Sequence, residues 1–274
     1  MRLKILIGVL SNPCNLHKRE FLRTHLRNLD RIFFTRKQCG RVSVEKNRDI
    51  VFVKDNSLYR LTSLITLFTH ARTKDYNWII KIDDDSYINT PVFINRIKYL
   101  NTINSEHILM GYMIWHSWNT FKHKPECFSF TRTNCLVINA TKNFPFVSGW
   151  SITLNKRLAM KILPLMEEEY KLLGAKHFVF EDIWFGYVMS KMTNNITIVN
   201  DRTGYNIYGK ASSNASDLED RLYPHIHSSN IMHHANLSIA RNYFLRHPAS
   251  MSTIRHDQEY NRDFWIVTNP GRKD

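Results

Sequence analysis

Apolar runs of strand length alternate with segments of helical periodicity along most of the chain. Continuous or alternating apolar runs predict β-strands, and apolar residues that recur every three or four positions predict helices. The predicted strands cover residues 3–10, 49–53, 78–82, 107–114 and 196–199, and a further strand is predicted directly after the turn at 148–149. The predicted helices cover 16–29, 57–71, 91–100, 155–173, 183–192 and 237–246. Strands and helices that alternate in this way predict an α/β fold with a mainly parallel central sheet.

The chain shows no internal repeat, linker or low-complexity segment, so its 274 residues predict a single domain. Residues 115–133 are polar, aromatic and irregular, and they predict a long loop. Loops of this length often bind substrates.

The strand predicted at 78–82 ends in three consecutive carboxylates, Asp83, Asp84 and Asp85. Like charges at this spacing repel one another and cannot be buried without partners. One interpretation is a site for Mg²⁺ or Mn²⁺, because these cations prefer carboxylate oxygens and would bind the phosphates of a substrate. The alternative is a solvated acidic turn, which the three aspartates alone do not distinguish from a metal site.

The composition is that of a folded protein with a basic surface. The chain is 43% hydrophobic and carries a formal net charge of +14. That charge attracts anions in general, including nucleic acids, phosphorylated small molecules and acidic glycans. The lysines and arginines are scattered, which argues against nucleic acid as a partner. The chain contains neither a dinucleotide-binding glycine motif nor a P-loop.

The four cysteines, Cys14, Cys39, Cys127 and Cys135, lack the spacing of a zinc site. Cys127 and Cys135 could form a disulfide in an oxidising compartment, and free thiols are expected otherwise. The apolar run at 3–10 is shorter than the ~20 residues that span a bilayer, and it lacks the features of a secretory signal. These observations predict a soluble, cytoplasmic protein.

Four stretches occur in collinear order: residues 7–13 with 18–23, the KIDDDSYIN segment at 81–89, the PFVSG segment at 145–149, and the EDIWFG segment at 181–186. In this order and spacing they resemble motifs of the β-1,3-glycosyltransferases of the galactosyltransferase and Fringe type. The resemblance covers most of the chain. It implies a GT-A fold in which residues 1–100, approximately, bind a UDP-sugar and a metal, and residues 101–274 bind a glycan acceptor.

The resemblance also implies a reaction and a set of site residues. The expected reaction is the transfer of a hexose or N-acetylhexosamine from a UDP-sugar, with inversion, to form a β-1,3 linkage to a glycan or glycoprotein. Mn²⁺ or Mg²⁺ is the expected cofactor. Asp85, Asp83 and His233 are the expected metal ligands, with His234 as the close rival of His233. Asp182 is the expected base that removes the proton of the acceptor hydroxyl.

The expected donor-binding residues are Ser11, Arg23, Lys81, Asp83 and Asp84. Simpler explanations exist for part of this site. Asp182 at the start of a helix is favoured by the helix dipole without any catalytic role, and either histidine could lie on the surface.

Three departures from the family pattern leave the donor and the acceptor open. Leu26 replaces a common tryptophan, the helix at 57–71 lacks an expected lysine, and Trp150 replaces a small residue. The family's membrane anchor is not seen, so a Golgi lumen location is the alternative if an anchor was removed. The alternative functions are a GT-A transferase with a different donor sugar, or a catalytically silent module that binds a glycan or nucleotide.

Overall fold

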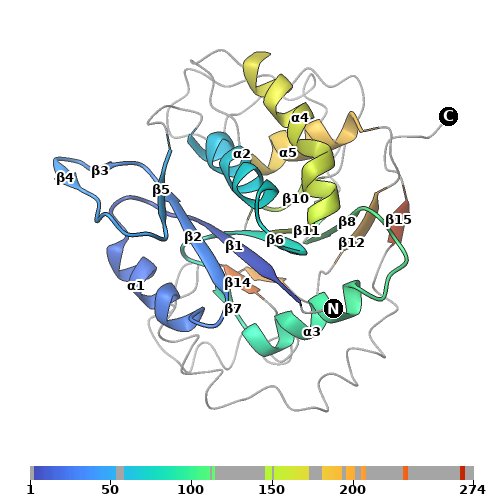
Figure 1. The fold of residues 1–274 in the computed structure, drawn as a ribbon, viewed down its shortest axis with the longest axis horizontal. Helices are drawn as coiled ribbons and strands as arrows, with labels where there is room; N and C mark the ends of the chain where they lie inside the picture. The colour runs from blue at the N-terminus through green and yellow to red at the C-terminus, as the bar shows by residue number, and fades with distance from the viewer. Residues whose placement is uncertain are drawn as a thin grey trace.

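The computed structural model describes residues 3–53, 59–111, 113–114, 146–149, 151–172, 181–192, 196–200, 205–207, 231–233 and 266–268 (Figure 1). The predicted loop at 115–133, the predicted helix at 237–246 and the suggested pairing of Cys127 with Cys135 lie outside these residues. No helix in the described part of the chain is long and apolar enough to cross a membrane.

The elements follow the predicted alternation of strands and helices. The helices are α1 (Leu16–His25), α2 (Tyr59–Arg72), α3 (Thr90–Leu100), α4 (Lys156–Leu172) and α5 (Glu181–Ser190). The strands are β1 (Ile5–Leu10), β2 (Asp30–Thr35), β3 (Gln38–Cys39), β4 (Val42–Ser43), β5 (Ile50–Phe52), β6 (Trp78–Asp83), β7 (Tyr87–Ile88), β8 (Ile108–Gly111), β9 (Met113–Ile114), β10 (Phe146–Val147), β11 (Ser151–Asn155), β12 (Thr197–Asn200), β13 (Tyr205–Ile207), β14 (Ile231–His233) and β15 (Ile266–Thr268).

An eight-stranded sheet forms the centre of the molecule, in the order β15-β12-β8-β11-β6-β1-β2-β5. β1 pairs in parallel with β2 and β6, and β12 pairs in parallel with β8. β11 runs antiparallel to both β6 and β8, and β15 runs antiparallel to β12. The predicted α/β fold with a mainly parallel sheet is confirmed. Because one sheet joins β1 to β12, the two predicted halves of the chain share it.

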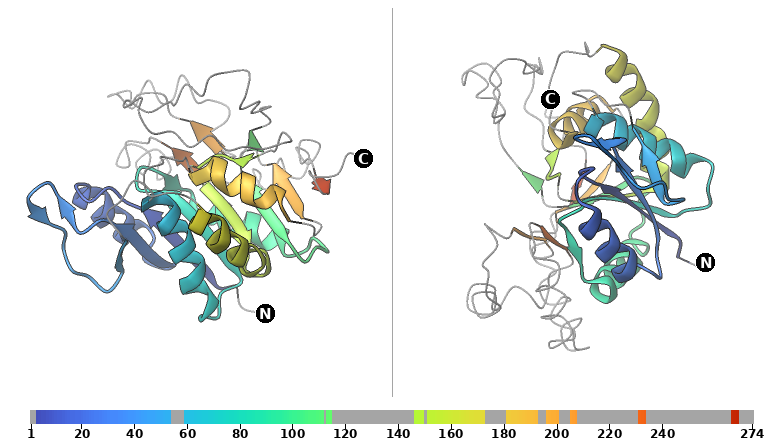
Figure 2. Two further views of the ribbon diagram at one scale, coloured as in Figure 1. Left: turned by 90° about the horizontal axis from the view of Figure 1, so that it is seen from above. Right: turned by 90° about the vertical axis from the view of Figure 1, so that its left-hand side faces the viewer.

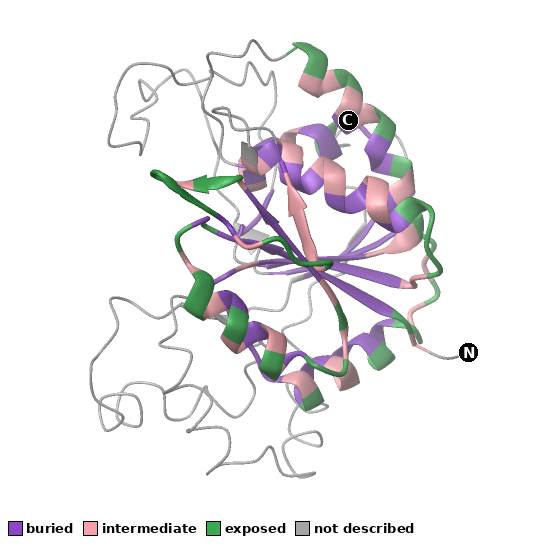
Figure 3. Ribbon diagram, turned by 60° about the vertical axis from the view of Figure 1, so that its left-hand side comes forward, coloured by how far each residue is buried: buried purple, intermediate pink, exposed green. Residues whose placement is uncertain are grey.

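The helices cover both faces of this sheet (Figures 1 and 3). Apolar side chains of α2, α4 and α5 pack in one cluster on the first face, and those of α1 and α3 pack in a second cluster on the other. Every residue of β1 is buried, as expected for a strand with helices on both sides. Gly8 allows α2 to lie close to β1, because a Cβ atom at Gly8 would be 2.5 Å from Leu67 Cδ2.

The fold differs from the sequence prediction at several places. The strand β2 and the β3–β4 hairpin were not predicted, because the apolar core of β2 is short and follows the charged residues Asp30 and Arg31. The strand predicted at 107–114 is split into β8 and β9, with β9 pairing with β10 instead of the central sheet. Gly111 marks the break, where a Cβ atom would lie 2.1 Å from Val147 Cγ1.

Candidate active site

The predicted carboxylates lie at the carboxyl end of β6, beside the end of β1. Asp83 is the last residue of β6 and pairs with Leu10. The Asp84 N–H donates to the carbonyl of Leu10 at 3.0 Å, and the Ser86 N–H donates to the carbonyl of Asp83 at 3.1 Å. The three aspartates therefore form a tight turn that is held by the backbone. This edge of a parallel sheet is where α/β proteins bind their ligands.

Asp84 is engaged by the loop that follows β1. Its Oδ2 accepts hydrogen bonds from Ser11 Oγ at 2.9 Å, from the Asn12 N–H at 2.9 Å and from Asn15 Nδ2 at 3.0 Å. Asp84 and Ser11 are both buried. The structure therefore brings together two predicted donor-binding residues, and each binds the other. Their contact with a nucleotide stays a prediction.

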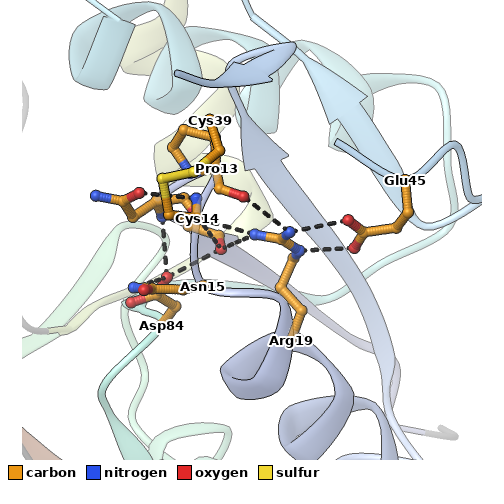
Figure 4. The surroundings of a disulfide bond; sticks show 9 residues. Pro13, Cys14, Asn15, Arg19, Cys39, Glu45 and Asp84 are labelled. Atoms are coloured by element: carbon orange, nitrogen blue, oxygen red, sulfur yellow. Dashed lines mark hydrogen bonds and ion pairs between the residues drawn. A yellow bond between two sulfur atoms is a disulfide. The ribbon is translucent and has the colours of Figure 1, made fainter. Parts of the chain in front are cut away.

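The arginine that supports this loop is Arg19, which the sequence analysis did not single out (Figure 4). Its side chain is fully buried, and its Nη1 donates to Ser11 Oγ at 2.9 Å and to the Asn12 carbonyl at 2.8 Å. Its Nε and Nη2 bind the two carboxylate oxygens of Glu45, at 2.8 and 2.9 Å. Such two-pronged pairs are strong and directional. Arg19 therefore fixes the loop between β1 and α1.

Arg23, the predicted donor-binding arginine, lies one helical turn further along α1. Its Nε and Nη2 donate to Asp49 at 2.8 and 2.9 Å, and its Nη1 donates to Glu20 at 2.6 Å. Its guanidinium also lies over the ring of Phe33, 5.1 Å from the centroid. Arg23 is thus engaged with β2 and with the residue before β5, and its predicted contact with the donor is not tested by this arrangement.

A disulfide between Cys14 and Cys39 joins the same loop to the β3–β4 hairpin (Figure 4). The pairing was not predicted, because the two cysteines are 25 residues apart and their spacing carries no signal. Together with the Arg19–Glu45 pair, the disulfide attaches residues 39–45 to the loop that holds Asp84.

Removing this disulfide is expected to destabilise the protein. Closing a loop of this length restricts the unfolded chain, so the Cys14→Ser/Cys39→Ser variant should lose ~3 kcal/mol of unfolding free energy. Urea unfolding of the variant, compared with the parent with and without dithiothreitol, measures the effect. A reduced parent that unfolds at the same urea concentration as the oxidised parent would contradict the expectation.

Lys81 lies in the middle of β6 and is fully buried. Its Nζ donates to Asp83 Oδ1 at 2.8 Å, to Glu181 Oε1 at 2.8 Å and to the carbonyl of Gly149. Burial by itself would lower the pKa of Lys81, but the two carboxylates outweigh it and raise this pKa above its ordinary value. The ammonium therefore stays charged and has three partners within the protein. Its contact with the donor stays a prediction.

Glu181 and Asp182 begin α5, as the sequence predicted, but they differ in their surroundings. Burial alone would raise the pKa of Glu181, yet the charges of Lys81 and Arg60 lower it to about 2. The Arg60 guanidinium lies 3.5 Å from Glu181 Oε2. Glu181 is therefore a buried, ionised partner of two cations.

Asp182 has the raised pKa that a base needs. Burial and the neighbouring charge of Glu181 raise the pKa of Asp182 to about 6. Its Oδ2 accepts a hydrogen bond from the Gly149 N–H at 2.9 Å, and its Oδ1 accepts one from the Ile183 N–H at 2.8 Å. A carboxylate with this pKa is ionised at neutral pH and binds a proton more readily than an ordinary aspartate does.

Gly149 belongs to the predicted acceptor segment, and the structure places it against both acids. A Cβ atom at this position would lie 3.2 Å from Asp182 Oδ2 and 3.3 Å from Glu181 Oε1. A glycine therefore allows the backbone to approach these carboxylates. The strand-end turn, the acceptor segment and the start of α5 meet at one edge of the sheet.

The predicted metal ligands are partly accessible at this edge. The side chains of Asp83 and Asp85 are 27% and 21% exposed, and Lys18 Nζ lies 4.0 Å from Asp85 Oδ2. β14 pairs antiparallel with β7, with Ile231 opposite Ile88 and Met232 opposite Tyr87. His233 follows Met232 and Asp85 lies two residues before Tyr87, so the register places the His233 backbone beside the carboxylate turn.

The predicted ligands Asp83, Asp85 and His233 suit a divalent cation. Carboxylate oxygens suit Mn²⁺ and Mg²⁺, and an imidazole nitrogen is a ligand that manganese accepts. Within the described residues, no three acidic, histidine or cysteine side chains already converge on one point. The set of Asp85, Asp83 and His233 stays a prediction, and His234 lies outside the described residues.

Comparison with solved structures finds matches among sugar transferases. A glycosyltransferase involved in the glycosylation of the major capsid of PBCV-1 has a TM-score of 0.41 and 11% identity, covering 86% of this chain and 96% of that one. The galactosyltransferase LgtC has a TM-score of 0.41 and 11% identity, covering 84% and 87%. Mouse xyloside xylosyltransferase 1 has a TM-score of 0.43 and 10% identity, covering 86% and 98%. Comparison with curated protein sequences finds no significant match.

The α/β sheet with acids at its strand ends is of the type that the four sequence motifs predicted, and the protein is a glycosyltransferase. The Fringe-like family matches residues 33–202, which is more than half of the chain and includes three of the four motifs. The chain belongs to the Fringe-like family, so the resemblance inferred from the motifs is confirmed.

Proposed function

We propose that the protein transfers a hexose or N-acetylhexosamine from a UDP-sugar to a hydroxyl group of a glycan acceptor, with inversion, to form a β-1,3 linkage. The observation that carries this proposal is the placement of Asp182. Its carboxylate is held by Gly149 of the acceptor segment, next to Glu181, and Lys81 connects Glu181 to Asp83 at the donor-side strand end. These contacts support a site in which the base Asp182 lies close to the donor-binding carboxylates.

The chain's own residues supply the proton transfer. Asp182 accepts the proton of the acceptor hydroxyl while that oxygen forms a bond to the anomeric carbon of the sugar. The bond from this carbon to UDP breaks in the same step, and its electron pair leaves with the UDP phosphate. A divalent cation bound by Asp85, Asp83 and His233 would supply Lewis-acid neutralisation of the diphosphate.

A panel of UDP-sugars tests this function. The protein is incubated with each donor, with Mn²⁺ and with glycan acceptors, and UDP release is measured with and without EDTA. Release that requires both the acceptor and Mn²⁺ supports the proposal, and the donor that gives it identifies the sugar. A protein that releases no UDP from any donor, and yet binds UDP, would instead be a silent binding module.

The disulfide bears on the compartment in which the protein acts. Disulfides persist in oxidising compartments and are rare in the cytosol. The Cys14–Cys39 bond therefore supports a lumenal or extracellular site of action over the cytoplasmic one expected from the sequence.

The reaction is expected to lose rate in acid with a midpoint near the raised pKa of Asp182, at pH of about 6. Only the ionised carboxylate accepts a proton, so activity is present above this pH and falls as the pH drops through it. The profile of kcat against pH at saturating donor measures the midpoint. In Glu181→Gln, one of the charges that raises this pKa is absent, so the midpoint should move to lower pH. An unchanged midpoint in that variant would contradict the assignment.

A further inference from the structure

The Lys81 ammonium is saturated by groups from three separate parts of the chain. Lysine is almost never fully buried unless it is paired, and its ammonium carries three N–H donors. Lys81 is fully buried, and its Nζ has three acceptors: Asp83 Oδ1 at 2.8 Å, Glu181 Oε1 at 2.8 Å and the Gly149 carbonyl. Three donors therefore meet three acceptors, and none remains directed toward a substrate.

The three acceptors belong to the elements that build the site. Asp83 ends β6 on the donor side, Gly149 precedes β11 on the acceptor side, and Glu181 begins α5. Two of these contacts lead directly to the base. The Gly149 N–H donates to Asp182 Oδ2 at 2.9 Å, and Glu181 is the residue before Asp182 in the same helical turn. Lys81 thus holds Asp182 both through the peptide of Gly149 and through the start of α5.

Resting on the proposed function, we propose that Lys81 is a positioning residue that sets the separation between the donor-side carboxylate Asp83 and the base Asp182. It contacts Asp83, Gly149 and Glu181 and does not contact the UDP-sugar. This role differs from the direct donor contact that the sequence predicted. The buried ammonium of Lys81 links Asp83 to Asp182 through its contacts with Gly149 and Glu181.

The consequence for the reaction follows from geometry. Transfer requires the acceptor hydroxyl, held by Asp182, to lie in line with the sugar carbon of the donor. A misplacement of about 1 Å costs on the order of 100-fold in rate. An arginine at this position would keep the charge, but its planar fork does not direct three N–H groups at three acceptors as an ammonium does. Charge alone would therefore not preserve the alignment.

The test compares Lys81→Arg with the control Lys98→Arg, a change at an exposed lysine of α3. For Lys81→Arg we expect kcat to fall at least about 50-fold, while the KM of the UDP-sugar and the Kd of UDP change less than about 3-fold. The control should match the parent. A kcat within about 3-fold of the parent would overturn the proposal. So would a large rise in the Kd of UDP with little change in kcat, because that split indicates direct donor contact.

A second variant and a second measurement keep the test decisive if Lys81→Arg does not fold. Glu181→Gln keeps an oxygen acceptor for Lys81 but removes the charge, and kcat should fall about 5- to 10-fold with the Kd of UDP unchanged. Amide hydrogen exchange at Gly149, followed by NMR, reports whether the Gly149 N–H stays bonded to Asp182, and it requires no turnover. Faster exchange in the folded variant, by about 10-fold, supports the positioning role, and unchanged exchange overturns it.

These readouts separate the failure of the positioning role from the failure of the proposed function. If the parent protein transfers no sugar while Gly149 loses protection in the variant, Lys81 does hold Gly149 in place and the proposed function is wrong. If the parent transfers sugar and both kcat and Gly149 protection survive the change at Lys81, the function stands and the positioning role is wrong.

Discussion

Replacement of Asp182 by asparagine is expected to reduce sugar transfer by a factor on the order of 10² to 10⁴ while UDP binding is retained. The amide has the shape of the carboxylate but does not accept the proton of the acceptor hydroxyl. Asp182 contacts Gly149 and its own helix and is not a predicted metal ligand, so the donor side should be intact. Initial rates of UDP release at saturating donor, together with UDP titration calorimetry, measure the two quantities.

A matched control separates chemistry from folding in this experiment. Asp75→Asn makes the same change at an aspartate whose side chain is 80% exposed and pairs with Lys4, away from the strand ends. The control should keep the activity and melting temperature of the parent. Asp182→Asn should melt close to the parent as well, and full activity of this variant would show that another group is the base.

Replacement of Asp85 by asparagine should weaken UDP binding in the presence of Mn²⁺ and reduce transfer by about 100-fold or more. A metal ion supplies several kcal/mol of charge stabilisation, which corresponds to this change in rate. Titration of Mn²⁺ into the protein with UDP present measures the loss of the ligand. UDP affinity with EDTA present should be the same in parent and variant, because the cation is then absent from both. If Mn²⁺ binds the variant as it binds the parent, Asp85 is not a ligand.

The sequence predicted which strand and helix carry the site residues better than it predicted the partners of each residue. The apolar run of β6 and the acids at its end identify the turn, and the position of Glu181 and Asp182 at a helix start is visible in the pattern. The division of labour among the aspartates is not visible. Asp84 is engaged by Ser11, Asn12 and Asn15, which become its neighbours only because β1 and β6 pair in parallel.

One missed residue, Arg19, illustrates what limits such predictions. Arg19 and Arg23 are four residues apart on the same face of α1, so the helical pattern gives no reason to prefer either. The two arginines differ in their partners, because Arg19 binds Glu45 and Arg23 binds Asp49. Both carboxylates follow the unpredicted strand β2. Lys81, in contrast, was predicted as a donor-binding residue, and its position in the sequence also indicated that it has internal partners. A lysine inside a strand that is buried on both faces requires carboxylate partners, and the acids of α5 were already singled out.

The direction of β1 has a practical consequence for handling the protein. The strand runs from Ile5 toward the carboxylate turn, and Lys4 contacts Asn77 and Asp75 at the start of β6. The N-terminal end of β1 therefore lies at the sheet edge opposite the site (Figure 2). A sensor chip or bead coupled at this end would hold the molecule with the carboxylate turn facing the solution, so a large acceptor could reach it without steric hindrance from the support.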